Sequence, residues 1–316
     1  MRRRVSRLLS LWTTALVVSF GTVALLATGC NLQQFTADST ADLLKNGSVA
    51  LDRESDLEFA RDALPGSLKT IETFLVSSPE NEHLLLLLAR GFTSYAFAFL
   101  ERDLEAAQLD GTQSQVDTLT RRTLLHYLRA REYGFRLLRR PTLQRAALDG
   151  DIKTVERELG DLTAEDVPGL FWSAYAWASA VNLSQNDPDM VGALPTIEKM
   201  MRRVIALKPG YFYSGAELFL GVYFASRPVM FGGDPEQART FFDDAMARHG
   251  EENLLIPYLY GRFYGTQTQD RAVFNAMIKK VLDANVESHP DVRLNNEVAR
   301  DRARFWLQHA DEILAE

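Results

Sequence analysis

Residues 220–245 read LGVYFASRPVMFGGDPEQARTFFDDA, and this stretch decides which fold we expect. Gly221 stands three residues before Phe224, and Ala238 stands four residues before Phe242. Small residues at such spacing let two helices approach each other, and the aromatic rings fill the space between them. The stretch therefore predicts two helices packed together and joined by a turn.

The connection between these two helices contains Gly232 and Gly233, which raises the alternative of a phosphate-binding loop. Such a loop needs G-x-x-x-x-G-K-[ST], or G-x-G-x-x-G after a strand, and the residues here fit neither pattern. Asp234 is a typical helix N-cap, and Pro235 follows at the first helical position. The carboxylate of Asp234 also places negative charge where a phosphate would bind. We therefore interpret the connection as a turn with an insertion.

The rest of the chain after residue 48 has helical periodicity, with apolar residues at three- and four-residue intervals. Ser55 and Glu58 form a predicted capping box for a first helix, and Asn81 is the predicted cap of a helix that is apolar almost all round and therefore buried. Further helices are predicted over residues 113–140, 164–183, 188–207, 211–225, 234–249, 267–284 and 292–314. No segment alternates long enough to indicate a sheet. The fold class is predicted to be all-α.

The small and aromatic residues also follow a degenerate repeat. The tetratricopeptide pattern asks for L-G-x₂-Y in one helix, A-x₃-F in the next and a closing proline. Residues 197–209, IEKMMRRVIALKP, repeat the spacing of the second helix and end on Pro209. The separation of Gly221 and Ala238 exceeds the regular one by about five residues, which lie in the predicted turn. We expect residues 49–316 to form one domain of stacked antiparallel helix pairs, a degenerate tetratricopeptide-like superhelix.

The N-terminus has the layout of a secretory signal. Four arginines within residues 2–7 precede an apolar segment, residues 8–26, and the segment ends in LLATGC. The sequence around Cys30, the single cysteine of the chain, resembles the bacterial lipobox. We predict a signal peptide over residues 1–29, then the lipidated Cys30 and a tether over residues 30–48; a spanning anchor is the alternative. Asn31, rather than aspartate, favours the periplasmic side of the outer membrane.

Charge and motifs exclude several classes of function. The formal charge is −7, and removal of the four signal arginines gives −7 − 4 = −11, which argues against nucleic-acid binding. The five histidines show no metal-ligand spacing, and no catalytic motif is present. We predict no enzyme activity, cofactor or metal site, although a glycosidase-like pair of carboxylates stays an open alternative.

Aromatic residues gather in three segments: 169–180, 210–224 and 256–265. At least half of them are interpreted as ordinary core, and the others as the lining of a cavity or a protein-contact surface. Arginine recognises carboxylates, so arginines beside these segments join the candidates. The candidate ligand-binding residues are Trp172, Tyr175, Tyr211, Tyr213, Tyr223, Arg227, Phe231, Tyr258, Arg262 and Tyr264.

Essentially the whole mature chain resembles the T component of tripartite ATP-independent periplasmic (TRAP) transporters, called TatT. The resemblance rests on ARDALPGSLKTIETFLVSSPENEHLLLLLARGF, FGGDPEQARTFFDDAM, YGRFYGTQTQDRAVFNAMI and VRLNNEVARDRARFWL. It implies a periplasmic lipoprotein that associates with the solute-binding protein of the transporter, as a homotrimer with a pore or cavity in each subunit. A small hydrophobic or carboxylate ligand would fit that role. The alternative is a general helical scaffold lipoprotein of envelope assembly with no ligand of its own.

Overall fold

The computed structural model describes residues 32–315, and within them the chain is built of helices and turns without a strand. The prediction of an all-α fold is therefore confirmed. The predicted signal peptide and the predicted lipidation site, Cys30, lie outside the described residues. The degenerate tetratricopeptide-like superhelix of stacked helix pairs stays a prediction.

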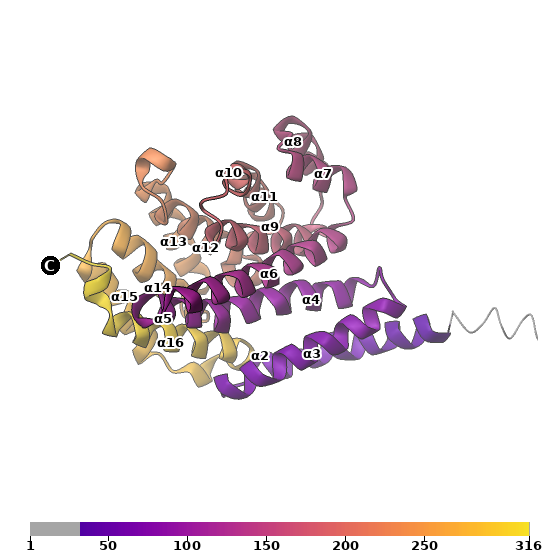
Figure 1. Ribbon diagram of the computed structural model, residues 1–316, viewed down its shortest axis with the longest axis horizontal. Coiled ribbons are helices and arrows are strands. Elements are labelled where there is room, and N and C mark those ends of the chain that lie inside the picture. Colours follow the sequence, from indigo (N-terminus) through magenta and orange to yellow (C-terminus); the bar gives the residue numbers. More distant parts are fainter. Residues whose placement is uncertain (1–31, 316) are drawn as a thin grey trace, which may run out of the picture.

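The chain forms long helices that alternate with short ones (Figure 1). A helix over residues 32–47 comes first. It is followed by α2 (Val49–Asp52), α3 (Leu57–Ser77), α4 (Glu82–Tyr95), the π-helix η1 (Ala96–Leu100), α5 (Glu101–Asp110), α6 (Gln113–Leu138), α7 (Pro141–Asp149), α8 (Ile152–Gly160), α9 (Val167–Asn182), α10 (Pro188–Gly192), α11 (Leu194–Leu207), α12 (Tyr211–Ala225), η2 (Val229–Phe231), α13 (Pro235–His249), α14 (Leu255–Leu259), the π-helix η3 (Tyr260–Gly265), α15 (Arg271–Asp283), η4 (Val286–Ser288), η5 (Pro290–Val292), α16 (Arg293–Gln308) and η6 (Ala310–Glu312).

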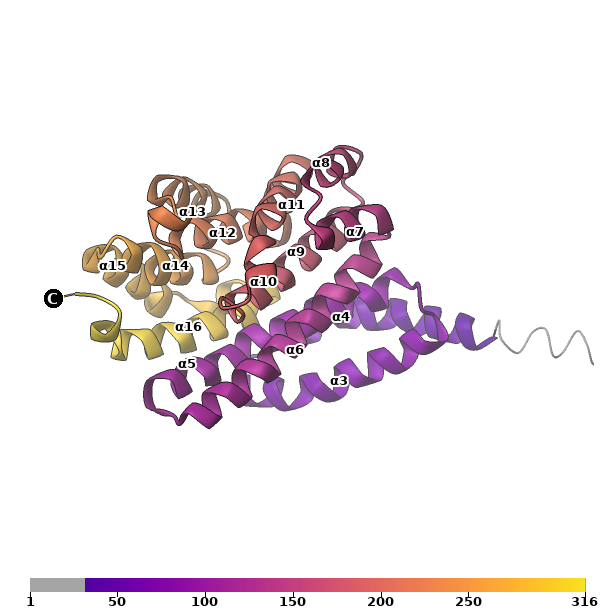
Figure 2. The ribbon, with the colours of Figure 1, turned by 45° about the horizontal axis from the view of Figure 1, so that its top comes forward.

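Helices that follow one another along the chain pack side by side. Helices α3, α4, α6, α9, α11, α12 and α13 contact one another in that order, and α15 contacts α16. The last long helix, α16, then returns to the start of the domain and contacts α2 and α3. Figure 1 labels α2 beside α16, and Figure 2 shows α16 next to α5 from a second direction. The last long helix of the array therefore lies against two of the first helices, α2 and α3.

The predicted tether differs from the structure. Residues 32–47 are helical, whereas the sequence placed the first helix near Val49. Ala37 and Ala41, one helical turn apart, are at most 1% exposed, and the carboxylate of Asp38 accepts hydrogen bonds from Ser78 Oγ (2.6 Å) and Asn81 Nδ2 (2.7 Å). Small residues one turn apart let this helix approach the domain closely. The sequence around them is too polar for its periodicity to be recognised.

The beginning of α3 lies one residue later than predicted. Asp56 is the N-cap, and its carboxylate accepts hydrogen bonds from the N–H groups of Glu58 (3.0 Å) and Phe59 (3.1 Å). Ser55 uses only its backbone N–H, which donates to Glu54 at 2.7 Å. The predicted cap of α4, Asn81, is confirmed, because its side chain accepts from the N–H of Leu84 at 3.0 Å. A capping carboxylate therefore replaces the predicted hydroxyl.

Replacing Asp56 with alanine should destabilise the protein by about 1 kcal/mol, because two N–H groups at the start of α3 lose their acceptor. The matched change Ser55→Ala should leave the free energy of unfolding within about 0.5 kcal/mol. Urea unfolding of both variants followed by circular dichroism tests the assignment. Equal losses, or a larger loss for Ser55→Ala, would contradict it.

Two predicted helices are divided in the structure. The segment 188–207 forms α10 and α11 around Ala193, because Pro195 in the first turn of α11 has no N–H to continue the helix. The segment 113–140 ends at Leu138 with Arg139 in the left-handed conformation (φ 53°). Pro141 then starts α7 rather than only ending α6. Helices α7 and α8 were not predicted.

The turn between α12 and α13 has the predicted structure. A side chain at Gly221 would come within 3.0 Å of the Phe242 ring, so the helices do meet at the small and aromatic positions. Asp234 accepts from the N–H groups of Glu236 and Gln237, and Pro235 begins α13. A Cβ atom at Gly233 would lie 1.8 Å from the carbonyl oxygen of Arg227, which requires glycine there. The double glycine serves a tight turn.

The continuous helix Glu82–Asp110 is long and apolar enough to cross a membrane by length and composition. It comprises α4, η1 and α5, and more than half of its most apolar window is buried inside the protein. Helix α4 contacts α3, α6 and α9. Packing within the protein accounts for its apolar composition.

A candidate binding cavity in the helical core

An aromatic cavity lies between η1, α9, α12 and α16, and we call it the inner chamber. Its volume is about 70 Å³. It is lined by Leu64, Thr93, Ser94, Phe97, Ala98, Phe99, Phe171, Trp172, Tyr175, Phe212, Gly215, Leu218, Asn253, Leu255, Leu294, Asn295 and Val298. Trp172 packs edge-on against two rings: its ring centre lies 4.9 Å from that of Phe171 and 4.8 Å from that of Phe212. The structure thus brings together the predicted residues Trp172 and Tyr175 on one wall.

The ring of Phe212 reaches this chamber from a strained turn. Phe212, Tyr213 and Ser214 all have positive φ (49°, 55° and 61°), although none is glycine. Each such residue costs roughly 1–2 kcal/mol, and strain of this kind persists only where the surroundings hold it. The Ser214 hydroxyl lies 2.8 Å from Nδ1 of His249, and the Asn253 amide donates to the Tyr213 carbonyl at 3.3 Å. The turn is therefore fixed in place at the edge of the cavity.

A second and larger cavity, the outer chamber, lies next to the first and has a volume of about 350 Å³. It is lined by Leu43, Leu44, Gly47, Ser48, Ala50, Leu51, Asp52, Ala63, Leu64, Ser67, Leu68, Ile71, Leu87, Arg90, Gly91, Ser94, Leu294 and Asn295. Residues 43–52 form one wall, and α3, α4 and the start of α16 form the others. Leu64, Ser94, Leu294 and Asn295 line both chambers, which therefore adjoin.

Arg90 and Asp52 are the charged side chains among the lining residues of the outer chamber. They form an ion pair through a guanidinium N–H of Arg90. The same guanidinium lies 5.2 Å from the centre of the Phe212 ring, which belongs to the inner chamber. Burial raises the pKa of the Asp52 carboxyl, and the neighbouring Arg90 lowers it again in part. Arg90 is thus a cation at the boundary between two mainly apolar spaces.

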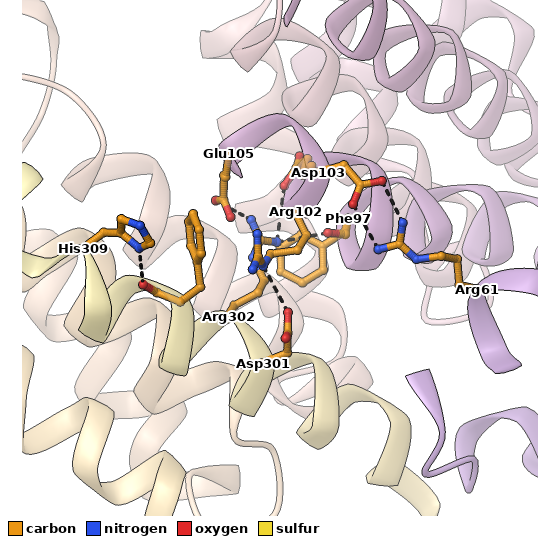
Figure 3. A network of polar contacts seen from close by, with 10 residues as sticks. Arg61, Phe97, Arg102, Asp103, Glu105, Asp301, Arg302 and His309 are labelled. Atoms are coloured by element: carbon orange, nitrogen blue, oxygen red, sulfur yellow. Dashed lines mark hydrogen bonds and ion pairs between the residues drawn. The ribbon is translucent and has the colours of Figure 1, made fainter. Parts of the chain in front are cut away.

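A buried ionic cluster lies behind the inner chamber, where α5 meets α16 (Figure 3). Arg302, which is 3% exposed, donates to Oε1 of Glu105 at 2.5 Å and to the carbonyl oxygen of Phe97 at 3.1 Å. It also lies 3.5 Å from Glu101, and the hydroxyl of Tyr127 donates to Glu101 at 2.6 Å. Phe97 stands on the π-helix η1, whose distorted backbone offers the carbonyl that Arg302 uses. The cluster therefore fixes the wall that carries Phe97.

Weaker ion pairs continue this cluster towards the surface. Arg102 donates to Asp301 at 3.1 Å, and its guanidinium lies 3.8 Å from the centre of the Phe305 ring. Arg61 of α3 makes two hydrogen bonds to Asp103, at 2.7 and 3.1 Å. Figure 3 shows that these pairs join α5 to both α3 and α16. Helix α5 is thereby held to both ends of the chain.

Burial influences the protonation states of the carboxyl and tyrosine hydroxyl groups in this region. It raises the pKa of the Glu101 carboxyl, which Arg302 and Tyr127 lower in part. Burial also raises the pKa of the Tyr127, Tyr175 and Tyr258 hydroxyls, so all three stay neutral over the physiological range. The lining of the inner chamber therefore carries no charge from tyrosine.

Comparison with known proteins identifies the family. The sequence model described as "TRAP transporter T-component" matches residues 53–314. The chain belongs to this family. An uncharacterized protein of Treponema pallidum (strain Nichols) is 25% identical over 262 residues, which cover 82% of this chain and 81% of that protein. Membership assigns the chain an accessory role in a TRAP-type transport system, at the membrane of the cell envelope.

Several predicted ligand residues of this T-component lie outside both chambers. Tyr211 packs edge-on against Phe171 at 5.4 Å, and burial raises its pKa to about 12. Tyr213, the middle residue of the strained turn, packs edge-on against His249. Phe231 is 66% exposed in the turn between α12 and α13. Tyr264 packs edge-on against Tyr260 at 5.3 Å.

The two predicted arginines also have other contacts. The guanidinium of Arg227 lies 3.7 Å from the centre of the Tyr223 ring and donates to the Tyr223 carbonyl, so it closes the end of α12. Arg262 lies 4.0 Å from the Trp306 ring, and its buried Nε has no hydrogen-bond partner within residues 32–315. Buried Tyr258 lies beside the ionic cluster, 5.9 Å from Arg302. Neither arginine lines a chamber.

The sequence analysis missed Arg90 of this T-component. The residue stands in LLLLLARGF, where it is the single charge in an apolar run, and that isolation was the available signal. Its partner, Asp52, lies 38 residues away in a short helix that periodicity does not reveal. No group of three or more potential metal ligands occurs in the described part of the chain.

Proposed function

We propose that this T-component is a lipid-anchored accessory protein on the periplasmic side of the outer membrane, which docks the solute-binding protein of a TRAP system and holds a small apolar ligand in its two chambers. The observation that carries the proposal is the family match over residues 53–314. The absence of a recognisable catalytic motif in the sequence supports a binding role.

The size and lining of the outer chamber support ligand binding. Its volume of about 350 Å³ falls within the range of roughly 300–1,000 Å³ that is typical of small-molecule sites. The inner chamber is too small to hold such a ligand alone and would take one end of it. Apolar walls with a few polar groups are the usual composition of such sites.

The lipid anchor would lie at the start of a helix whose other end lines this cavity. Only Asn31 separates Cys30 from the helix over residues 32–47, and the part of that helix that lines the outer chamber begins roughly 20 Å further along, at about 1.5 Å per residue. Acyl chains on Cys30 would therefore hold the helix at the membrane surface. Mass spectrometry of protein purified from membranes should show a processed, acylated Cys30. An unprocessed N-terminus would contradict the anchor.

Association with the solute-binding protein is tested with both purified proteins. We expect them to co-elute in size-exclusion chromatography and to give a saturable heat in isothermal titration calorimetry. Multi-angle light scattering of the T-component alone should give three times the mass of the chain if the proposed homotrimer forms. No association in either experiment, together with unchanged solute uptake after deletion of the gene, would contradict the proposed function.

A further inference from the structure

The outer chamber contains an ion pair whose partners differ in how firmly they are held. Arg90 belongs to the long buried helix α4 and packs against the Phe212 ring. Asp52 is the last residue of α2, a helix of four residues with no buried residue and no side-chain N-cap. Gly47, which also lines the chamber, precedes α2. Segments with few buried contacts open at low free energy, so Asp52 is the partner that can move.

Most N–H donors of the Arg90 guanidinium make no hydrogen bond within the described residues. Within residues 32–315, its side chain makes one hydrogen bond to the protein, through Nη2 to Asp52. A guanidinium carries five N–H groups and binds carboxylates in pairs. Arg53, which follows Asp52, binds Asp291 at 2.7 Å in an exposed ion pair, and neither of these residues lines the chamber. Arg90 is therefore the cation that a ligand within the chamber would meet.

We propose that Arg90 binds the carboxylate of a single-chain apolar acid whose chain fills the outer chamber, and that Asp52 occupies the same position when no ligand is bound. The inference rests on the proposed function as a ligand-holding protein. A carboxylate needs a cation in so apolar a space, because burying an unpaired charge is strongly unfavourable. Asp52 supplies the matching internal anion, and it keeps Arg90 paired in the empty protein.

The carboxylates of Asp52 and of the ligand compete for Arg90, and this competition determines how each substitution changes the affinity for the ligand. Arg90→Gln removes the charge that selects the acid and leaves the apolar walls unchanged. Asp52→Asn removes the internal competitor and frees the guanidinium. A ligand of the same chain length with a hydroxyl in place of the carboxylate should respond to neither change, because it does not use the charge of Arg90.

The experiment uses the full mature chain and two fluorescent probes, cis-parinaric acid and the corresponding alcohol. Arg90→Gln should weaken binding of the acid about 10- to 100-fold, as expected for loss of a charge-assisted hydrogen bond, and leave the alcohol within about twofold. Asp52→Asn should strengthen binding of the acid about tenfold. Arg90→Lys keeps the charge and should retain part of the affinity.

Asp42→Asn is the matched control, because Asp42 lies in the helix over residues 32–47, forms an exposed pair with His83 and does not line the chamber. It should leave both probes unchanged. Equal weakening of acid and alcohol by Arg90→Gln would overturn the proposal, as would equal gains from Asp42→Asn and Asp52→Asn. Failure of the unmodified protein to bind either probe would also overturn it, while association with the solute-binding protein would still stand as a separate result.

Discussion

Replacing Arg302 with methionine should lower the free energy of unfolding by about 3–5 kcal/mol at neutral pH, because it leaves buried carboxylates without their cation. Methionine keeps an apolar stem but lacks the guanidinium, which lies 4.4 Å from the centre of the Phe97 ring. The loss therefore reports the charge, this ring contact and the hydrogen bonds to Glu105 and the Phe97 carbonyl. Urea unfolding followed by circular dichroism gives the free energy directly.

The pH dependence of the Arg302→Met variant separates the ionic cluster from ordinary packing. Burial already raises the pKa of Glu101, and Arg302 lowers it, so removal of Arg302 raises that pKa further. A group whose pKa is raised by folding binds protons more tightly in the folded state, so its contribution to stability is lost as the pH rises through the raised pKa. The deficit of the variant should thus be largest at pH 7–8 and shrink on acidification.

Two controls accompany the Arg302 prediction. Glu101→Gln and Glu105→Gln combined with Arg302→Met should recover much of the stability, because no buried charge is then left unpaired. Arg248→Met removes an exposed i,i+4 pair with Asp244 and should cost less than about 1 kcal/mol. A loss for Arg302→Met that is small, or constant with pH, would show that the cluster does not hold α5 to α16.

Local features were predictable from the sequence. Asn81 caps its helix, Asp234 and Pro235 begin α13, and Gly221 meets Phe242, because each of these contacts depends on residues close in the chain or on one repeat spacing. The helix over residues 32–47 was missed because only two alanines of it are buried as apolar core. Periodicity detects a stripe of large apolar side chains, and such a short stripe of small ones is not resolved.

The site could be predicted only in part. Trp172 and Tyr175 stand on one face of α9, and the spacing of the aromatic segment indicated them. The charged pairs could not be predicted from the sequence, because Arg302 pairs with residues about 200 positions away and Arg90 pairs with a residue in a four-residue helix. No pattern in the sequence relates such positions. Of the two arginines chosen from their aromatic neighbours, Arg227 stacks on Tyr223 of its own segment, whereas Arg262 stacks on Trp306 of α16.

Gly134→Ala should destabilise the protein by about 1–3 kcal/mol, although alanine is a better helix former than glycine. Helices α6 and α9 pack so closely that a Cβ atom at Gly134 would lie 2.6 Å from the backbone nitrogen of Ser173. One turn along, a Cβ atom at Gly169 would lie 2.6 Å from the backbone of Leu138. Both clashes involve main-chain atoms, so a rotamer change cannot relieve them and the helices must separate.

The Gly134 and Gly169 substitutions should not be additive, because both widen the same contact between α6 and α9. Once Gly134→Ala has moved the helices apart, the second methyl group has room, so the double variant should lose less than the sum of the two single losses. Thermal and urea unfolding measure all three, with Gly66→Ala as control, since nothing lies within 4 Å of a Cβ atom there. That control should be neutral or stabilise by up to about 1 kcal/mol.

Because α9 carries Trp172 and Tyr175, separation of the helices should also change probe binding in the inner chamber. Full additivity, or no loss at Gly134, would mean that the helices are not in the close contact that forms this wall of the cavity.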